Sequence, residues 1–326
     1  MSFSSDVKDE ICKQTGTARH CQIAEFAALF ALIGNIKMDR YGEPYLRMHT
    51  ENLTVAGKSY ILLKKIFGVE VDVSVRNHNF HAGTLEYSIV IKRVKDVISI
   101  LKAVKIMDEQ NNQWGDFSTV HPLIVQNICC RRAFLRGAFL VAGSITNPEK
   151  AYHLEIAVLS EKFAEQIRQI ISFFEIDAKI VERKKYFVVY VKEGAQIVDF
   201  LNIIGAHKAL MEFENIRILK EVRNSVNRQV NCETANISKT VTAAARQIED
   251  IEYIQQNMGL GKLADGLREV AELRLEYPEK SLLELGNMLS KPLGKSGVNH
   301  RLRKLGEIAE QLREERIELS PIKEEC

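Results

Sequence analysis

A basic segment near the C-terminus carries the side chains best suited to contact a nucleic acid. Between Lys291 and Lys304 there are five basic residues and no acidic one. They are Lys291, Lys295, Arg301, Arg303 and Lys304. Lysine and arginine pair with phosphate groups, whereas asparagine, histidine and arginine can hydrogen-bond to the edges of bases. Because the segment combines both kinds of side chain, its chemistry is that of a DNA-contacting surface.

Two short helices separated by a turn are expected to position these residues. An apolar stripe at helical spacing predicts the first helix, and its members are Leu282, Leu285 and Leu289. Ser281 can cap this helix, which KPLG (291–294) must end because proline lacks an N–H and glycine costs backbone entropy. A second helix then starts near Ser296, with a second apolar stripe of Val298, Leu302, Leu305, Ile308 and Leu312. An upstream helix over 263–276 would complete a three-helix domain.

The outer face of the second helix is polar and basic. Ser296, His300 and Arg303 lie opposite the apolar stripe, and Asn299 and Lys304 flank them. Two helices joined by a glycine-containing turn, the second basic outside, are typical of a DNA-reading helix-turn-helix, here about Lys280 to Arg313. A helical hairpin with an ordinary solvated basic face is the alternative. In the DNA interpretation, base edges meet Asn299, His300 and Arg303, and phosphates meet Lys295, Arg301 and Lys304.

Composition restricts the class of protein. The chain has 326 residues, enough for two or three domains, and a net charge of +2, so any DNA-binding charge must be local. Its six cysteines form no C-x-x-C pair and no zinc spacing. We therefore expect no metal and no cofactor, in a reducing cytoplasm. The N-terminus reads as a capped helix, not a signal peptide, and no apolar run approaches the roughly 20 residues that a bilayer demands.

The N-terminal two thirds contain an internal repeat. Phe26–Ile36 (FAALFALIGNI) and Leu135–Ile145 (LRGAFLVAGSI) match at an offset of 109 residues, and each ends in glycine and a small polar residue. Similar elements follow in both halves. The strands are Tyr45–Thr50, Val69–Arg76 and Leu85–Lys92 in the first half, and Tyr152–Leu159, Ile176–Arg183 and Tyr186–Lys192 in the second. The following helices are Lys58–Phe67 and Asp96–Met107, and Glu161–Phe174 and Ala195–Ile204.

Each half is expected to be an αββαββα unit, the first about 20–115 and the second about 126–222. Small residues one helical turn apart (Ala24 with Ala28, Ala133 with Gly137) allow the two glycine-ended helices to pack closely about a pseudo-twofold axis. The predicted fold class is α+β: this double repeat over 1–222, then an all-α domain. Arg223–Asn236, with four asparagines, is the expected boundary; 223–258 would be linker and connecting helix, and 259–326 the helix-turn-helix domain.

Paired αββαββα units joined through such helices resemble the LAGLIDADG homing-endonuclease fold. With a helix-turn-helix appended, the chain resembles the bacterial WhiA family of sporulation and cell-division regulators. The stretches that carry this resemblance are Cys129–Ile145, Asn227–Ile254 and Gly294–Leu305. The family implies a DNA-binding protein of the nucleoid, acting in cell division, chromosome segregation or transcription linked to sporulation. It also implies that the helix after the boundary ties the two parts together.

Active LAGLIDADG enzymes hold their catalytic metals on an acid just before each terminal glycine. Those positions are Ile33 and Ala142 here, and no carboxylate lies within two residues of either. Hydrolysis by that mechanism is therefore not expected, and no catalytic residue is assigned. His78 and His81 lie where a hairpin loop is expected, and a solvated turn is the simplest interpretation.

The predicted function is non-enzymatic, sequence-recognising binding of double-stranded DNA. Two alternatives stay open. One is a regulatory scaffold that binds a protein partner through the repeat and DNA only weakly; the other is a surviving nuclease. Basic residues of the repeat could also contact a DNA backbone, but the interspersed acids weaken that case.

Overall fold

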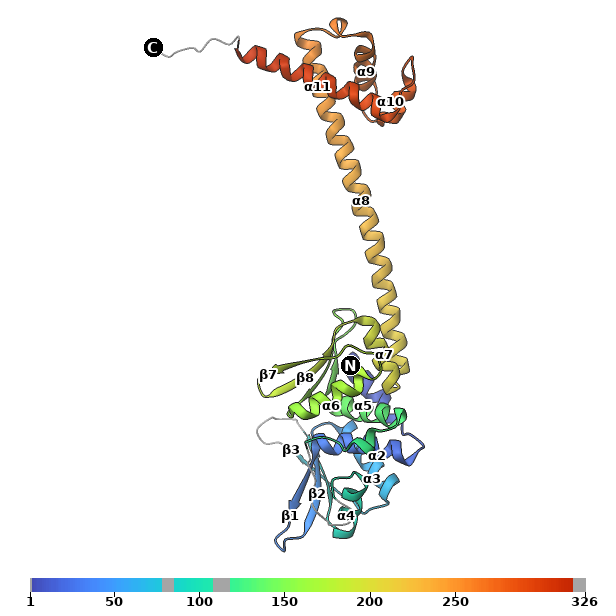
Figure 1. The fold of residues 1–326 in the computed structure, drawn as a ribbon, viewed down its shortest axis with the longest axis vertical. Helices are drawn as coiled ribbons and strands as arrows, with labels where there is room; N and C mark the ends of the chain where they lie inside the picture. The colour runs from blue at the N-terminus through green and yellow to red at the C-terminus, as the bar shows by residue number, and fades with distance from the viewer. Residues whose placement is uncertain (1, 78–84, 108–117, 319–326) are drawn as a thin grey trace, which may run out of the picture. The chain divides into compact units, whose positions relative to one another are not determined.

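The structure, a computed structural model, describes residues 2–77, 85–107 and 118–318. The chain forms two compact units, Met1–Glu221 and Val222–Cys326 (Figure 1). Each unit has its own hydrophobic core. His78 and His81, named above as a hairpin loop, lie outside the described residues.

The first unit contains two αββαββα repeats preceded by the helix α1 (Phe3–Lys13). The first repeat comprises α2 (Arg19–Ile33), β1 (Gly34–Met38), β2 (Pro44–Thr50), α3 (Leu53–Phe67), β3 (Asp72–Asn77), β4 (Leu85–Ile91) and α4 (Val94–Ala103). The second comprises α5 (Ile128–Ala142), β5 (Gly143–Ile145), β6 (Leu154–Val158), α6 (Glu161–Ser172), β7 (Lys179–Arg183), β8 (Tyr186–Val191) and α7 (Gly194–Ile204). A short 3₁₀ helix, η1 (Pro122–Val125), precedes α5. The predicted repeat order is confirmed.

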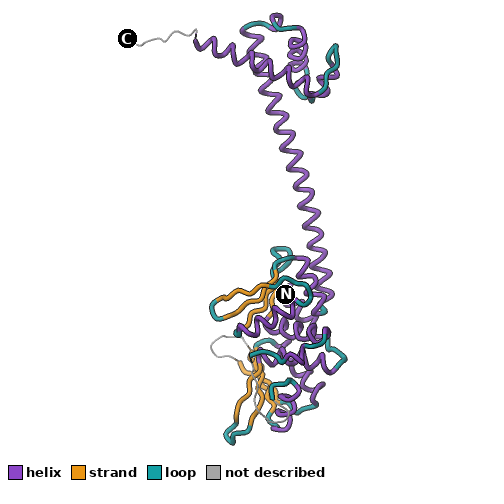
Figure 2. Tube along the Cα trace, in the orientation of Figure 1, coloured by secondary structure: helices purple, strands orange, loops and turns teal. Residues whose placement is uncertain are grey.

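Each repeat contains a four-stranded antiparallel sheet with the same topology. The strand orders are β1-β2-β4-β3 and β5-β6-β8-β7. Period-two alternation of buried residues is clear in β2 and β6, whereas β3 is exposed along its whole length. In the central strand pairs Leu46 lies opposite Ile91 and Leu154 opposite Val191, and all four side chains are buried. The helices lie on one side of the sheets, as the tube in Figure 2 shows.

The helices α2 and α5 form the centre of this unit, and small residues let them approach closely. Ala24, Ala28 and Ala133 are fully buried. A Cβ added at Gly137 would lie 2.6 Å from the carbonyl oxygen of Glu25, which leaves room only for glycine. The predicted packing of the two glycine-ended helices through small residues is therefore seen in the structure.

A buried ionic group fixes these helices further. The carboxylate of Glu25 lies 3.0 Å from the Lys58 Nζ and accepts two hydrogen bonds, of 3.0 and 3.1 Å, from Arg136. Glu25 and Lys58 are both 0% exposed. The Lys58 ammonium also donates to the carbonyl oxygens of Cys12, in the last turn of α1, and of Gln14, the residue that caps this helix. Because every partner is needed to neutralise or satisfy the others, this group joins α1, α2, α3 and α5.

The second unit is helical. The helix α8 (His207–Asn257) runs into it from the first unit and is followed by η2 (Leu260–Lys262), α9 (Asp265–Glu276), α10 (Leu282–Met288) and α11 (Lys295–Glu318). Its core is formed by one side of each helix, with Ile251 and Ile254 from α8 packed near Val270, Leu285 and Leu302.

The segment 223–236, expected as a linker ahead of the connecting helix, lies within α8, which starts at His207 and includes both. The physical reason is the absence of a helix breaker, because 207–257 contains neither proline nor glycine. Its asparagines lower helix propensity by only tenths of a kcal/mol, roughly 0.5 each. Among the described helices, none combines the length and the hydropathy needed to cross a bilayer.

Candidate nucleic-acid interface

The helix α10 begins with a capping box, as Ser281 predicts. The Ser281 Oγ accepts from the Glu284 N–H at 3.4 Å, and the Glu284 carboxylate accepts from the Ser281 N–H at 2.9 Å. These hydrogen bonds hold the pKa of Glu284 below its usual value, because they favour the charged carboxylate. The first helix of the motif is thereby fixed at its start.

The turn between α10 and α11 depends on a glycine that the sequence pattern did not single out. The Leu293 N–H donates to the Gly286 carbonyl at 3.0 Å, and a Cβ at Gly286 would lie 2.1 Å from the Leu293 oxygen. The turn can fold back onto α10 only because residue 286 has no side chain. Gly294, the predicted breaker, has open space around it.

The helix α11 has the two faces expected from its sequence. Val298, Leu302 and Leu305 are at most 3% exposed. The opposite face is solvent-exposed and carries six of the seven residues assigned to DNA. These are Lys295, Ser296, Asn299, His300, Arg303 and Lys304. The structure therefore brings these six side chains onto one accessible surface.

Arg301, the seventh residue, lies differently. Its side chain is half-buried and its Nη1 donates to the Gly266 carbonyl oxygen at 2.9 Å. A Cβ at Gly266 would lie 3.1 Å from the guanidinium carbon, so the glycine makes room for this contact. Arg301 thus holds α11 against the start of α9, and its remaining N–H groups are the only ones free for a phosphate.

The charge on this face is largely unneutralised. Arg303 lies 3.4 Å from Glu307, one helical turn further on, in an exposed pair. Within the described part of the chain, Lys295 and Lys304 have no carboxylate within ion-pairing distance. The first turns of α11 are therefore a local positive surface on a chain whose net charge is only +2.

Another arginine, Arg274 in α9, is buried and supports the helix-turn-helix from the neighbouring helix. Arg274, 2% exposed, donates from Nη1 to the carbonyls of Lys280, at 2.9 Å, and Pro278, at 3.3 Å. Burial lowers the pKa of its guanidinium. These bonds hold the loop that leads into α10. The sequence gives no signal for this role, since Arg274 reads as one of many charged residues on a helix.

The resemblance expects catalytic acids at two positions that carry Ile33 and Ala142 in this chain. Ile33 and Ala142 are the last residues of α2 and α5. The following glycines, Gly34 and Gly143, are required because a Cβ there would lie 2.3 and 2.2 Å from the rings of Phe30 and Phe139. No side chain at Ile33 or Ala142 can coordinate a metal ion.

Two carboxylates further along the chain, Asp39 and Glu155, are already engaged. Asp39 accepts from the N–H groups of Tyr41 and Glu43 in the β1–β2 turn. Glu155 accepts from Arg183 and Ser144 and lies 3.2 Å from the His153 Nε2. Neither carboxylate replaces the missing acids at the helix ends.

Several basic side chains of the two sheets are paired with acids. Arg93 lies 2.6 Å from Glu70, Lys92 2.8 Å from Asp72 and Arg183 3.2 Å from Glu155. Arg47 and His49 both meet Glu86. These positions of the sheets therefore carry neutral pairs, in contrast to Lys295 and Lys304 of α11, whereas Lys184 and Lys185 at the β7–β8 turn meet no carboxylate among the described residues.

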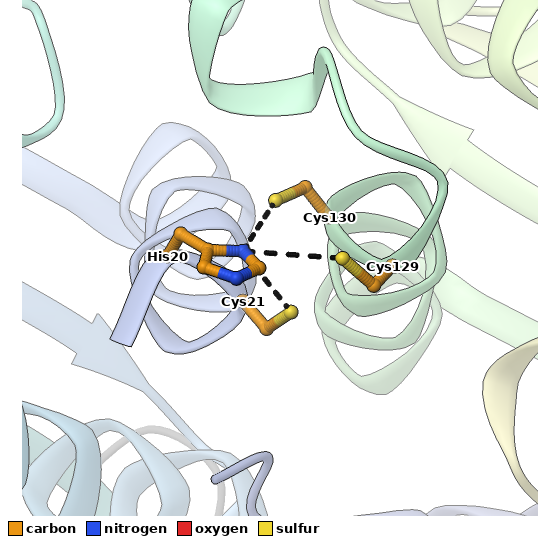
Figure 3. A group of neighbouring side chains, drawn as sticks. All are labelled: His20, Cys21, Cys129 and Cys130. Carbon is orange, nitrogen blue, oxygen red and sulfur yellow. Dashed lines mark hydrogen bonds between the residues drawn. The ribbon is translucent and has the colours of Figure 1, made fainter. Parts of the chain in front are cut away.

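One group of side chains escaped the sequence analysis. His20, Cys21, Cys129 and Cys130 come together at the start of α2 and α5 (Figure 3). Burial and the neighbouring Cys129 thiol raise the pKa of Cys21 to about 12, and burial also raises that of Cys130. Local spacing missed them because the two pairs are far apart in sequence. Only the repeat offset could have signalled their meeting.

The fold and these surfaces define a class: a LAGLIDADG-like double repeat without its acids, followed by a helix-turn-helix domain. Three family models match the chain. They describe the WhiA N-terminal LAGLIDADG-like domain over 19–107, the WhiA LAGLIDADG-like domain over 131–223 and the WhiA C-terminal HTH domain over 226–309.

Known proteins match over nearly the whole length. A "Probable cell division protein WhiA" of Lachnoclostridium phytofermentans is 53% identical over 96% of this chain and 100% of its own. One of Alkaliphilus oremlandii is 49% identical over 97% and 99%. The crystal structure of full-length DUF199/WhiA from Thermatoga maritima aligns with a TM-score of 0.57 at 29% identity, over 95% of this chain and 99% of that one. The chain belongs to the WhiA family.

Proposed function

We propose that this protein binds double-stranded DNA in a sequence-dependent manner through α11. The first turns of α11 enter the major groove. Asn299, His300 and Arg303 contact base edges, and Lys295 and Lys304 pair with phosphates, with Ser296 beside them. Arg301 adds a phosphate contact only through the N–H groups that Gly266 does not use.

The single observation that carries this proposal is the exposed face of the first turns of α11, where Lys295–Lys304 contains no acidic residue. The apolar side of α11 packs into the core of the second unit. The six polar side chains therefore point outward from a helix that is held in place. Specific recognition requires such rigidity, because base-edge hydrogen bonds tolerate little misplacement.

The test separates base contacts from phosphate contacts. Sites selected from random DNA by the full-length protein are footprinted and then bound by single alanine variants. Asn299→Ala and Arg303→Ala should cost about 1–3 kcal/mol on the selected site and relax one position of the sequence. Lys304→Ala should weaken selected and unrelated DNA equally. Protection of no preferred sequence would contradict the proposal.

We further propose that the repeat does not cleave DNA. Two-metal hydrolysis requires carboxylates at the helix ends, and Ile33 and Ala142 supply none. Incubation of supercoiled plasmid with the protein and Mg²⁺ should yield no nicked product. Nicking that EDTA abolishes, and that survives further purification, would overturn this.

Membership of the WhiA family suggests the cellular role. The relatives named above carry the words "probable cell division protein". We propose that this chain acts at the nucleoid, in cell division, chromosome segregation or sporulation-linked transcription. Mapping its chromosomal binding sites in dividing cells tests this, since a division role predicts sites beside division or segregation genes.

A second candidate function is a regulatory scaffold, and one observation favours it. The edge strand β3 exposes two apolar side chains, Val73 and Val75, each more than half accessible. An exposed edge can pair with a strand of a protein partner. A scaffold predicts that Val73→Lys/Val75→Lys abolishes the cellular role while footprints persist.

A further inference from the structure

Two pairs of neighbouring residues meet at one point although more than a hundred positions separate them in sequence. His20 and Cys21 lie in the first turn of α2, and Cys129 and Cys130 in the first turn of α5. The offset that relates the two repeats carries His20 onto Cys129 and Cys21 onto Cys130. The four side chains therefore occupy equivalent places in the two halves and converge between the two central helices (Figure 3).

The distances are those of a metal-binding tetrahedron. The His20 Nδ1 lies 3.1 Å from the Cys130 Sγ, 3.4 Å from the Cys21 Sγ and 3.9 Å from the Cys129 Sγ. All four ligand atoms lie within 4.8 Å of one another. Bond lengths of about 2.3 Å to sulfur and 2.0–2.1 Å to nitrogen, in tetrahedral geometry, place nitrogen and sulfur about 3.6 Å apart and two sulfurs about 3.8 Å apart. Small side-chain shifts would complete the site.

The donor set selects the ion. Three thiols and one imidazole are soft and borderline ligands, which favour Zn²⁺ over Mg²⁺ or Ca²⁺. Cys21, Cys129 and Cys130 lie in the first turns of α2 and α5, so helix backbone holds the three thiol ligands in place. Four protein ligands also leave no open coordination position, as in structural rather than catalytic zinc sites.

We propose that His20, Cys21, Cys129 and Cys130 form a Cys₃His zinc site that ties the two repeats together at the start of their central helices. The ion would join α2 to α5 at one end, while Gly137 and the Glu25 group join them further along. Because binding requires the folded arrangement of both helices, zinc binding stabilises the repeat unit. The site has no part in reading DNA.

The experiment uses the full-length chain purified without chelators. Zinc and iron are quantified per chain by mass spectrometry, and the metal-free protein is then titrated with Co²⁺, whose d–d absorption reports tetrahedral thiolate coordination. The expected content is about one zinc per chain. The variants Cys129→Ser and His20→Gln, both changed at exposed residues, should lose most of the zinc and the Co²⁺ spectrum while retaining the native circular dichroism.

A matched control is Cys232→Ser, which removes an exposed thiol of α8 and should retain the wild-type zinc content. Chelation should lower the unfolding midpoint of the wild type and of the control, but not that of Cys129→Ser. The proposal is overturned if the wild type binds neither zinc nor Co²⁺ above the Cys129→Ser level. It is equally overturned if alkylation shows a Cys21–Cys129 or Cys21–Cys130 disulfide in the native protein, or if the metal is iron.

Discussion

The sheets of the repeat and the first turns of α11 are both exposed and both contain basic residues, yet they differ in how the charge is balanced. On the sheets, Arg47, Lys92 and Arg93 each meet a carboxylate. On α11, Lys295 and Lys304 meet none within the described residues. A phosphate backbone can displace solvent from an unpaired lysine, whereas a paired one must first give up its acid. Counting basic residues would miss this difference.

Buried charged side chains also have different structural roles in the two regions. In the repeat, the buried carboxylate of Glu25 joins helices at the place where the two halves meet. In the second unit, the buried guanidinium of Arg274 fixes the loop that leads to α10. The first joins the central helices of the two repeats, and the second supports a helix that presents side chains outward. Each can be broken separately.

The largest expected effect is a loss of stability in the repeat unit. Glu25→Ala leaves the Lys58 ammonium buried without its counter-charge, which should destabilise the repeat unit by about 3–5 kcal/mol. Urea unfolding followed by hydrogen exchange of α2 and α5 measures this. The matched control is Glu165→Ala, which breaks an exposed pair with Arg168 and should cost less than about 1 kcal/mol. Equal effects of the two changes would contradict the role of the Glu25 group.

The second largest expected effect is a loss of stability in the second unit. Arg274→Ala removes the donors to the Lys280 and Pro278 carbonyls and should destabilise α9–α11 by about 1–3 kcal/mol. Hydrogen exchange should show the loss there and not in the sheets. Arg268→Ala, which breaks only exposed pairs with Asp265 and Glu272, is the control. Faster exchange spread over both units would mean that they do not fold independently.

A smaller effect concerns the capping box. Ser281→Ala removes one hydrogen bond at the start of α10 and should cost about 1 kcal/mol. Thermal unfolding with exchange of α10 as the local readout checks it. Ser225→Ala, in the exposed middle of α8, should cost nothing, because alanine is the better helix former. A comparable loss from both changes would remove the capping box from the account.

The smallest effect is a pH dependence. A hydrogen bond from the Ser290 N–H, at 2.5 Å, holds the pKa of Glu269 below its ordinary value of 4.5. A lowered pKa in the folded state contributes stability above pH 4.5 that is lost as the pH falls through the folded value. Glu269→Gln should flatten the acid decline of the second unit and leave the repeat unchanged. An unaltered acid profile would contradict this contact.

Much of this molecule could be predicted from periodicity. The apolar stripes at Leu285 and Val298 predicted α10 and α11, and the matched stretches at Phe26 and Leu135 predicted the repeat. These signals are local or repeat at a fixed offset, so a single sequence displays them. The asparagine-rich segment 223–236 was expected as a linker because its composition differs from that of its neighbours. It is helical because it contains no residue that breaks a helix.

Long-range contacts were beyond the same reasoning. The partners of Arg301, Arg274 and Glu25 lie on other turns or other elements, and a charged residue on a helix looks the same whether it is solvated or buried. The His20 and Cys129 pairs show the limit most clearly. Metal-ligand spacing was considered only within one segment of the sequence. The four side chains instead come from two segments, one in each repeat, that the pseudo-twofold arrangement brings together.

The central claim is that α11, not the repeat, holds the DNA. The most direct test measures DNA binding by the full-length protein, with fluorescence anisotropy as the readout, across a salt series. Lys295→Ala/Arg303→Ala/Lys304→Ala is compared with the equally charged change Arg183→Ala/Lys184→Ala/Lys185→Ala at the β7–β8 turn, and Arg301 is left intact to preserve folding. The α11 variant should lose most of its affinity, and its salt slope should fall by about 0.9 for each phosphate contact removed. The β7–β8 variant should bind like the wild type. The reverse pattern would place DNA on the sheets and contradict the account.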